Sequence, residues 1–331
     1  MTSLRCKRSW LALWAILLSP ALAFGVSVPD LYDAAQPVES SQDAAFAEAL
    51  KTVLVRVSGQ RDAPARLGAA LGNPRQFVQR FGVTADNVLE VGFDDVSIDQ
   101  LLLDAGLPIW GRERPLTLVV LKLEELGGGW SSAESPPLDQ ARIANAARAR
   151  GVPLMWASID AQDQSLLSAA VGSSSGLLQI AQRYGANAIL LGEGRRDASI
   201  RWTLASPDGV AQAGGALEDG AHLAADTFAQ VFATAGSSLI HVSIEVAGIS
   251  DLHAYAATTN YLEGMTLVRH LAVEQVAGDT VRFRLAVRGD AATLRRAIAL
   301  DDRLVSLASV GSDPADMATD AGGRLAFRYQ P

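Results

Sequence analysis

The sequence predicts a protein of mixed α/β and α+β class that is built from three small units. Patterns typical of strands and helices alternate along most of the 331 residues, and runs rich in glycine and proline divide them into groups. Hydrophobic residues make up 49% of the chain and charged residues 19%, which is enough for each group to bury its own core.

The first 23 residues have the pattern of a cleavable secretion signal. Arg5, Lys7 and Arg8 give a basic start, an apolar run covers residues 10–19, and small residues end at Ala23 with the spacing that a signal peptidase reads. The apolar run is about half of the roughly 20 residues that a membrane-spanning helix needs. We therefore predict cleavage after Ala23 and a periplasmic mature protein that is not an integral membrane protein.

The charge and the cysteine content of the mature chain exclude several kinds of partner and site. Removal of three basic and no acidic residues with the signal changes the formal net charge from −8 to −11. An acidic chain without basic runs is repelled by nucleic acid and by anionic lipid, so we expect neither as a main partner. The one cysteine, Cys6, is removed with the signal, which leaves no thiol nucleophile, disulfide or cysteine metal ligand.

Residues 24–114 are predicted to form an N-terminal α+β unit. An extended segment over 26–39 leads to a helix that is capped at Ser41 and stopped by Gly59, with an apolar residue at every third or fourth position. A cap and a first-turn proline, Asn73-Pro74, predict a short helix over 75–82. The alternating segment 87–94 predicts a strand, and Ser97 begins a further helix that ends at Gly106.

The segment Ala105 to Pro115, AGLPIWGRERP, has two interpretations. Its glycines and prolines favour a tight corner between two units, in which Trp110 is buried and the arginines lock the units together. Trp110 beside Arg112 and Arg114 is also the residue set of a pocket for an anionic group, because arginine forks bind carboxylates.

Residues 115–236 are predicted to form a central α/β domain, and residues 237–311 a C-terminal domain. The central domain alternates strands and helices and ends in an antiparallel hairpin around Pro207-Asp208-Gly209. The C-terminal domain has the order βαββα(β), with a possible last strand over 303–309, which suggests a ferredoxin-like sandwich. Residues 312–331, rich in Asp, Ala and Gly, are predicted to be a flexible tail.

Two glycine-containing motifs resemble catalytic or cofactor-binding motifs only in part. Gly172 to Gly176 fits the GxSxG nucleophile motif, but a weak AAV segment stands where a buried strand is required, so Ser174 or Ser175 is expected to cap a helix. Gly192-Glu193-Gly194 lacks both the third glycine and the following helix of a dinucleotide fingerprint, and it is expected to be a turn or bulge between two strands.

Dispersed histidines and adjacent acids give no metal or cofactor prediction. His222, His241, His253 and His270 have no HxxxH or HxH spacing. The pairs Asp94-Asp95 and Asp301-Asp302 place neighbouring carboxylates in different directions, so we expect helix capping rather than acid-base chemistry. No catalytic, cofactor-binding or metal residue is therefore predicted.

One strand pattern offers a candidate partner surface. In the segment 281–288, arginines alternate with apolar residues, so that the two kinds occupy opposite faces of the strand. The default is a solvated sheet face, and the alternative is a docking surface for an acidic partner. Together with the corner, the possible partner surface consists of six residues: Trp110, Arg112, Arg114, Arg282, Arg284 and Arg288.

Several phrases together resemble a known family. VLVRVSG at 53–59, AGLPIWGRERP, ARGVPLMW at 149–156 and RYGANAILLG at 183–192 are similar in order and spacing to secreted proteobacterial proteins named only "domain of unknown function 2066". That resemblance extends from about Leu31 to Leu300 and implies no activity, cofactor or catalytic residue.

The central region is more distantly similar to the N-terminal α/β domain of the periplasmic protein TolB and to envelope lipoproteins that activate penicillin-binding proteins. The likeness rests on RYGANAILLGEG, the following WTL strand and the helix HLAADTFAQVFA, and it covers about residues 116–235. These relatives are adaptors, so the resemblance implies a binding module by analogy of fold.

The sequence thus favours an uncharacterised periplasmic adaptor or binding protein of the cell envelope without enzymatic activity, whose partner is an envelope protein. Two alternatives remain. One is a secreted serine hydrolase that uses Ser174 with His241 or His253. The other is a carrier of a small amphiphilic ligand in a cleft between the units.

Overall fold

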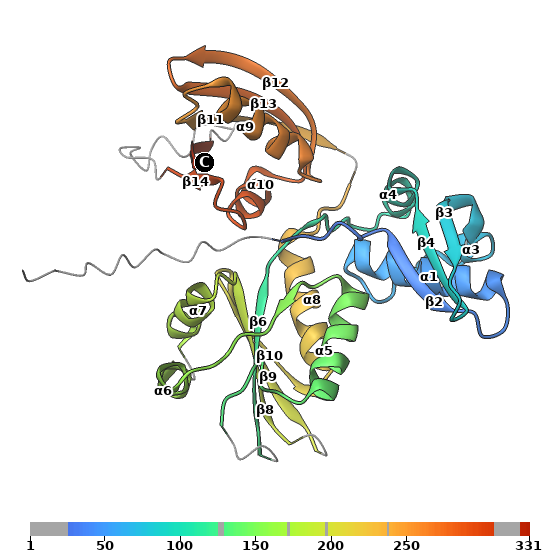
Figure 1. Cartoon of the computed structure of the whole chain (residues 1–331). Coiled ribbons are helices and arrows are strands. Elements are labelled where there is room, and N and C mark those ends of the chain that lie inside the picture. Colours follow the sequence, from blue (N-terminus) through green and yellow to red (C-terminus); the bar gives the residue numbers. More distant parts are fainter. Residues whose placement is uncertain (1–25, 125–128, 171–172, 196–197, 237, 308–324) are drawn as a thin grey trace, which may run out of the picture.

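The three groups of elements form three units that meet at a common junction (Figure 1). The computed structural model describes residues 26–124, 129–170, 173–195, 198–236, 238–307 and 325–331. Each unit has its own core of buried side chains, and the central unit has one on each side of its sheet. The chain is therefore of mixed α and β structure with several separate sheets.

The N-terminal unit packs helices on a small antiparallel sheet. Its strands lie in the order β2 (Asp33–Pro37), β4 (Val88–Phe93) and β3 (Val78–Val83). The longest helix, α1 (Gln42–Ser58), buries its apolar stripe against this sheet. The shorter elements are α2 (Ala63–Arg66), α3 (Gly68–Leu71), η1 (Pro74–Phe77) and α4 (Asp95–Asp104). A two-residue strand, β1 (Val26–Ser27), pairs with β5 (Glu113–Arg114).

Local sequence explains where the main helix begins and ends, but not the segment after Asn73. The Ser41 side chain accepts a hydrogen bond from the Ala44 amide, and Gly59 ends α1 in the left-handed conformation at φ 71°. The predicted helix over 75–82 is wrong beyond its first turn, because residues 78–83 pair with β4 as a strand. Pairing and burial against a neighbouring strand override the local helix signal.

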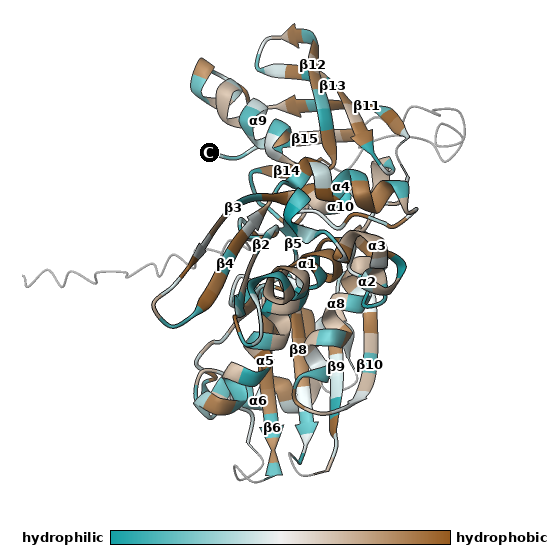
Figure 2. Cartoon of the chain, turned by 90° about the vertical axis from the view of Figure 1, so that its right-hand side faces the viewer, coloured by the Kyte–Doolittle hydropathy of each residue, from teal (hydrophilic) through white to brown (hydrophobic). Residues whose placement is uncertain are grey.

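The central unit is a five-stranded sheet covered on both faces (Figure 1). The strands β6 (Thr117–Leu123), β7 (Leu154–Met155) and β8 (Ala188–Gly194) are parallel, and β9 (Ile200–Ser206) and β10 (Gly209–Gly215) continue the sheet antiparallel. Helices α5 (Pro137–Arg150) and α8 (Asp219–Phe232) cover one face, and α6 (Ala161–Ala170) and α7 (Ser174–Arg183) cover the other. The inner strands are largely apolar along their length, as Figure 2 shows for β6 and β8.

Two features of the central unit differ from the sequence prediction. The segment VPLMWAS at 152–158 is one of the strands that the alternating pattern predicts, but only the two residues of β7 are a strand, and helix α6 was not predicted at all. Helix α6 buries only Asp163, Leu167 and Ala170, so its sequence carries a weak apolar stripe.

The C-terminal unit is a second five-stranded sheet, with both helices on one face. The strands are β11 (Leu239–Ala247), β12 (Val268–Ala277), β13 (Thr280–Arg288), β14 (Leu304–Ser306) and β15 (Leu325–Tyr329). Their order is β12-β13-β11-β15-β14. Helices α9 (Leu252–Gly264) and α10 (Ala291–Ile298) pack on the apolar face of the sheet, which includes Phe283 of β13.

The prediction of a flexible tail over residues 312–331 is wrong for its last part. Residues 325–329 form β15, which pairs parallel to β11 and antiparallel to β14. Leu325 and Phe327 of this five-residue strand are buried in the core, and their burial stabilises the strand. Within the described residues, no helix is both long and apolar enough to cross a membrane.

Candidate functional site

The corner segment contacts all three units. The Trp110 amide donates to the Val57 carbonyl at the end of α1, at 2.7 Å, and Ile109 forms an antiparallel bridge with Thr234 after α8. Toward the C-terminal unit, the Arg112 amide donates to the Thr266 hydroxyl at 3.0 Å. The Glu113 carboxylate accepts from the Thr266 amide, also at 3.0 Å. The segment is thus the point at which the units are joined.

Arg114 is fully buried and gives all its donor groups to backbone carbonyls. Its Nε donates to Gly111 at 2.8 Å, its Nη1 to Arg150 and Gly151 at 3.1 and 3.0 Å, and its Nη2 to Arg56 and Trp110, both at 2.8 Å. The guanidinium also stacks on the Trp110 ring, 3.7 Å from the ring centroid. No donor of this side chain remains for a ligand.

Three of the five carbonyls that hold Arg114, those of Arg56, Arg150 and Gly151, come from the C-terminal ends of two helices. Helix α1 ends at Gly59 and helix α5 ends at Gly151, and both glycines adopt the left-handed conformation. The C-terminal end of a helix carries partial negative charge, so a cation between two such ends is stabilised without a carboxylate. Burial lowers the pKa of Arg114, and the nearby Arg56 and Arg150 lower it further. Arg114 therefore fixes α1 relative to α5.

Three residues of the predicted partner surface are buried, and for them that prediction is wrong. Trp110 and Arg114 are 0% exposed, because the corner is enclosed by the units it joins. Arg288 is 6% exposed and lies 3.5 Å from the Asp99 carboxylate of α4. The same carboxylate accepts from the Tyr32 hydroxyl and from Arg269, so Asp99 links the N-terminal and C-terminal units.

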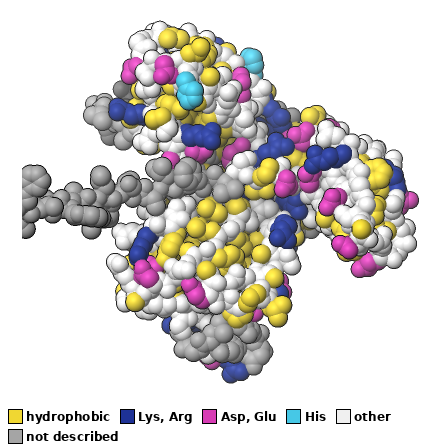
Figure 3. All heavy atoms as spheres, in the orientation of Figure 1, with side chains coloured by type: hydrophobic (Ala, Val, Ile, Leu, Met, Phe, Trp, Pro, Cys, Tyr) yellow, Lys and Arg dark blue, Asp and Glu magenta, His cyan; other side chains and the backbone are white. Residues whose placement is uncertain are grey.

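The other three predicted surface residues are accessible but form ion pairs. Arg112 lies 3.3 Å from Asp95 and 5.3 Å from the centroid of the Tyr32 ring. Arg282 pairs with Glu245 at 3.1 Å and Arg284 with Glu274 at 2.5 Å, across strands of the same sheet. Figure 3 shows basic side chains gathered where the N-terminal unit meets the other two.

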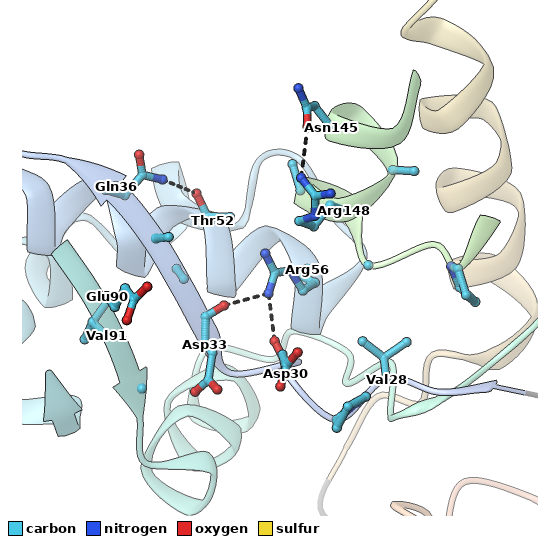
Figure 4. A pocket seen from close by; sticks show the side chains of 18 of the residues that line it. Val28, Asp30, Asp33, Gln36, Thr52, Arg56, Glu90, Val91, Asn145 and Arg148 are labelled. Atoms are coloured by element: carbon cyan, nitrogen blue, oxygen red, sulfur yellow. Dashed lines mark hydrogen bonds between the residues drawn. The ribbon is translucent and has the colours of Figure 1, made fainter. Parts of the chain in front are cut away.

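A cleft of about 990 Å³ lies between the N-terminal unit and the central unit. Strand β2 with its neighbours β3 and β4 forms one side, and α5 with the segment 151–156 forms the other (Figure 4). The walls are largely apolar, and they include Val28, Ala35, Ala144, Leu154 and Trp156. This size and lining are typical of sites for small organic ligands.

The polar groups of the cleft include three arginines. Arg80 forms an ion pair with Asp33 of β2. Arg56 of α1 donates from Nη1 to the carbonyls of Asp30 and Asp33, at 2.9 and 2.7 Å. Arg148 of α5 donates to the Asn145 side chain at 2.9 Å. The sequence analysis did not identify Arg56 or Arg148. The signal for Arg56 is an arginine within the apolar run VLVRVSG.

The structure does not place the GSSSG serines in a nucleophile elbow. The AAV segment is not a strand, because Ala169 and Ala170 are the last residues of α6, and Val171 and Gly172 lie outside the described residues. Ser173, rather than Ser174 or Ser175, caps α7 by accepting from the Gly176 amide. Ser174 belongs to the central unit, whereas His241 and His253 belong to the C-terminal unit.

The remaining motif predictions are partly confirmed. Gly192 and Gly194 lie in β8, which pairs antiparallel with β9, so the segment leads into a hairpin and not into a helix. Asp94 caps α4 by accepting from the Ser97 amide, as predicted. Asp301 does not cap a helix, because it follows α10 and accepts from the Arg303 amide. Across the described ranges, no group of three His, Cys, Asp or Glu residues is arranged to hold a metal ion.

A family model described as "Domain of unknown function (DUF8605)" matches residues 25–111. The matched region comprises the N-terminal unit and ends within the corner segment. No curated protein and no solved structure matches the chain.

Proposed function

We propose that the protein is an exported, non-enzymatic binding protein whose ligand site is the cleft between the N-terminal and central units. The cleft itself carries this proposal, because it combines about 990 Å³ of space, largely apolar walls and a small number of polar groups. Among the alternatives from the sequence, a carrier of a small amphiphile agrees best with this geometry.

The Arg114 junction supports the proposal because it holds the two sides of the cleft together. Helix α1 lies on one side and α5 on the other, and their C-terminal carbonyls share the same guanidinium. A site that is already formed without ligand loses less conformational freedom on binding.

We also propose the finer fold assignments that the sequence suggested. Without β15, the C-terminal unit has the strand and helix order of a ferredoxin-like sandwich, with β15 inserted between β11 and β14. For the central unit, the mixed sheet with two helices on each face supports the likeness to the N-terminal domain of TolB.

A blocking substitution tests the proposed site. Ala144 lines the cleft, whereas Ala141 lies on the same helix, is exposed and is not part of the lining. We expect Ala144→Trp to abolish the ligand that co-purifies with the mature protein, as detected by native mass spectrometry, and Ala141→Trp to retain it. Equal ligand content in both variants would contradict the proposal. The mass of the same sample tests export, because cleavage after Ala23 leaves Phe24 as the first residue.

An adaptor for an envelope protein is the second candidate, and the observation that favours it is the edge strand β12. Val273 and Val276 of this strand are 41% and 63% exposed, beside the ion pair of Arg284 with Glu274. A photocrosslinker at Val276 is expected to capture one saturable partner in intact cells. Val210, 49% exposed on the edge strand β10, is the matched control position and should capture none.

A further inference from the structure

Arg56 is a buried cation whose hydrogen-bonding capacity is only partly used. Its side chain is on α1, and the residue is 7% exposed. Only Nη1 donates, to the carbonyls of Asp30 and Asp33. Nε is buried without a partner, and Nη2 forms no hydrogen bond with any described residue. No carboxylate in the described ranges forms an ion pair with it. A buried charge in this state is unfavourable until an anion neutralises it.

Arg148 places a second cation at the same end of the cleft. In Figure 4 the Arg148 guanidinium lies above Arg56, and its one drawn hydrogen bond is to Asn145 on its own helix. Within the described part of the chain it also has no carboxylate partner. Burial lowers the pKa of Arg56, Asp33 and Asp30 raise it, and Arg148 lowers it. A bound anion between the two guanidinium groups would stabilise both.

The acidic residues of the cleft limit the charge of that anion. Asp30, Asp33 and Glu90 also line the cleft, and the Asp33 carboxylate is paired with Arg80. Figure 4 shows Glu90 on β4, on the opposite side of β2 from Arg148. A ligand with one negative charge therefore fits better than one with several, provided that its charge is at the end formed by α1 and α5.

The apolar part of the cleft begins next to the two arginines. Residues 151–154 and Trp156 continue directly from α5, and Ala144 and Ala147 face the cleft from the helix itself. An aliphatic chain that extends from the arginines along this wall would leave water for an apolar surface, which favours binding in proportion to the apolar area buried.

We propose that the cleft binds an amphiphile with a carboxylate head and an aliphatic body, an inference that rests on the proposed function. The carboxylate accepts hydrogen bonds from Nη2 of Arg56 and from the Arg148 guanidinium, and the aliphatic body lies against the wall that ends at Trp156. Guanidinium and carboxylate groups match in geometry as well as in charge.

Titration calorimetry with four ten-carbon probes tests the proposal: decanoate, decyl phosphate, 1-decanol and decyltrimethylammonium. We expect decanoate to bind at least tenfold more tightly than 1-decanol. Arg148→Gln should raise the Kd of decanoate about tenfold and leave that of 1-decanol unchanged. Arg142→Gln is the matched control, because Arg142 lies on the same helix outside the cleft and pairs with Glu218. It should change neither Kd.

The possible results separate this inference from the function on which it rests. Equal binding of decanoate and 1-decanol, both lost in Ala144→Trp, would overturn the carboxylate head but retain the cleft as the site. If decyl phosphate binds most tightly, the preferred head group is a phosphate and not a carboxylate. If decyltrimethylammonium binds most tightly, the head group is a cation that the acidic residues of the cleft bind, and the proposal is overturned. Failure of all four probes to bind would count against the proposed function itself. Arg56→Lys, which keeps the buried charge, should weaken decanoate binding without unfolding the protein.

Discussion

Arg114 and Arg56 are both buried arginines near the C-terminal end of α1, yet their surroundings differ. Arg114 directs its donors to five carbonyls and stacks on Trp110, whereas Arg56 uses one nitrogen for two carbonyls and borders a cleft. Burial lowers the pKa of both. The number of satisfied donors, and not burial, therefore distinguishes the arginine that joins the units from the one that we propose as a ligand-binding residue.

Replacing Arg114 should have the largest effect on stability. Arg114→Met leaves five carbonyls without their donor in a buried place, and we expect it to lower the free energy of unfolding by about 4 kcal/mol. Arg114→Lys should also be destabilising, because an ammonium group cannot reproduce the planar fork. Urea unfolding followed by tryptophan fluorescence measures both. A loss from Arg114→Met no greater than that from the exposed Arg148→Met would refute this assignment.

Gly151 tests whether the Arg114 site tolerates added volume. A methyl group on Gly151 would lie 2.4 Å from Nη1 of Arg114, and the residue has φ +69°. We expect Gly151→Ala to cost about 3 kcal/mol, the sum of backbone strain and overpacking. Gly106 has φ +65° but nothing within 4 Å of an added methyl group, so Gly106→Ala should cost only about 1 kcal/mol. Thermal unfolding of the two variants gives the comparison, and equal losses would contradict it.

Arg56 should show the opposite balance between stability and binding. Arg56→Met leaves only two carbonyls without their donor, and we expect a loss of about 2 kcal/mol, roughly half that of Arg114→Met. Its binding of decanoate should fall at least tenfold, and by more than that of a folded Arg114→Lys variant, in which both guanidinium groups of the cleft remain. Titration calorimetry without urea, under conditions in which both variants are folded, measures the Kd of decanoate for each. A larger loss of affinity in the Arg114 variant than in the Arg56 variant would remove the distinction between the two arginines.

The smallest expected effect is on the pH dependence of stability, and it comes from His222. Burial lowers the pKa of His222 from its ordinary value, and Arg150 and Arg61 lower it further, against the smaller influence of Asp219 and Asp226. A histidine whose pKa is lower in the folded state than in the unfolded state binds a proton more readily when the protein is unfolded. Its neutral form is therefore compatible with folding above about pH 6.5, and stability is lost as the pH falls below that value. The urea midpoint should therefore fall less between pH 7.5 and 5.5 in His222→Gln than in the parent protein. An unchanged pH dependence would show that this site does not contribute.

Local signals in the sequence were sufficient for most of the fold. Ser41 and Gly59 define the ends of α1, and the apolar run 117–123 forms the buried strand β6. Residues 78–83 and 325–329 were predicted wrongly because both are short strands whose stability comes from pairing with distant segments. Such pairing is not encoded in the local pattern.

The candidate site was less predictable than the fold. The corner was correctly interpreted as a junction, but its arginines cannot be assigned without knowing which carbonyls surround them. Arg114 and Arg112 are two residues apart, and one is fully buried while the other is accessible. The cleft brings together residues 28–36 and 144–156, and only the tertiary packing of α1 on α5 makes them neighbours.

The position of β15 has a consequence for how the protein folds during its synthesis. The strand over residues 325–329 separates β11 from β14 in the sheet, although it follows both of them in the chain. The N-terminal and central units use only residues that emerge earlier, so both can reach their final form while translation continues. The C-terminal sheet cannot be completed beside β11 until residues 325–329 have been synthesised, and before then it exposes the edge of a central strand to any other extended chain nearby.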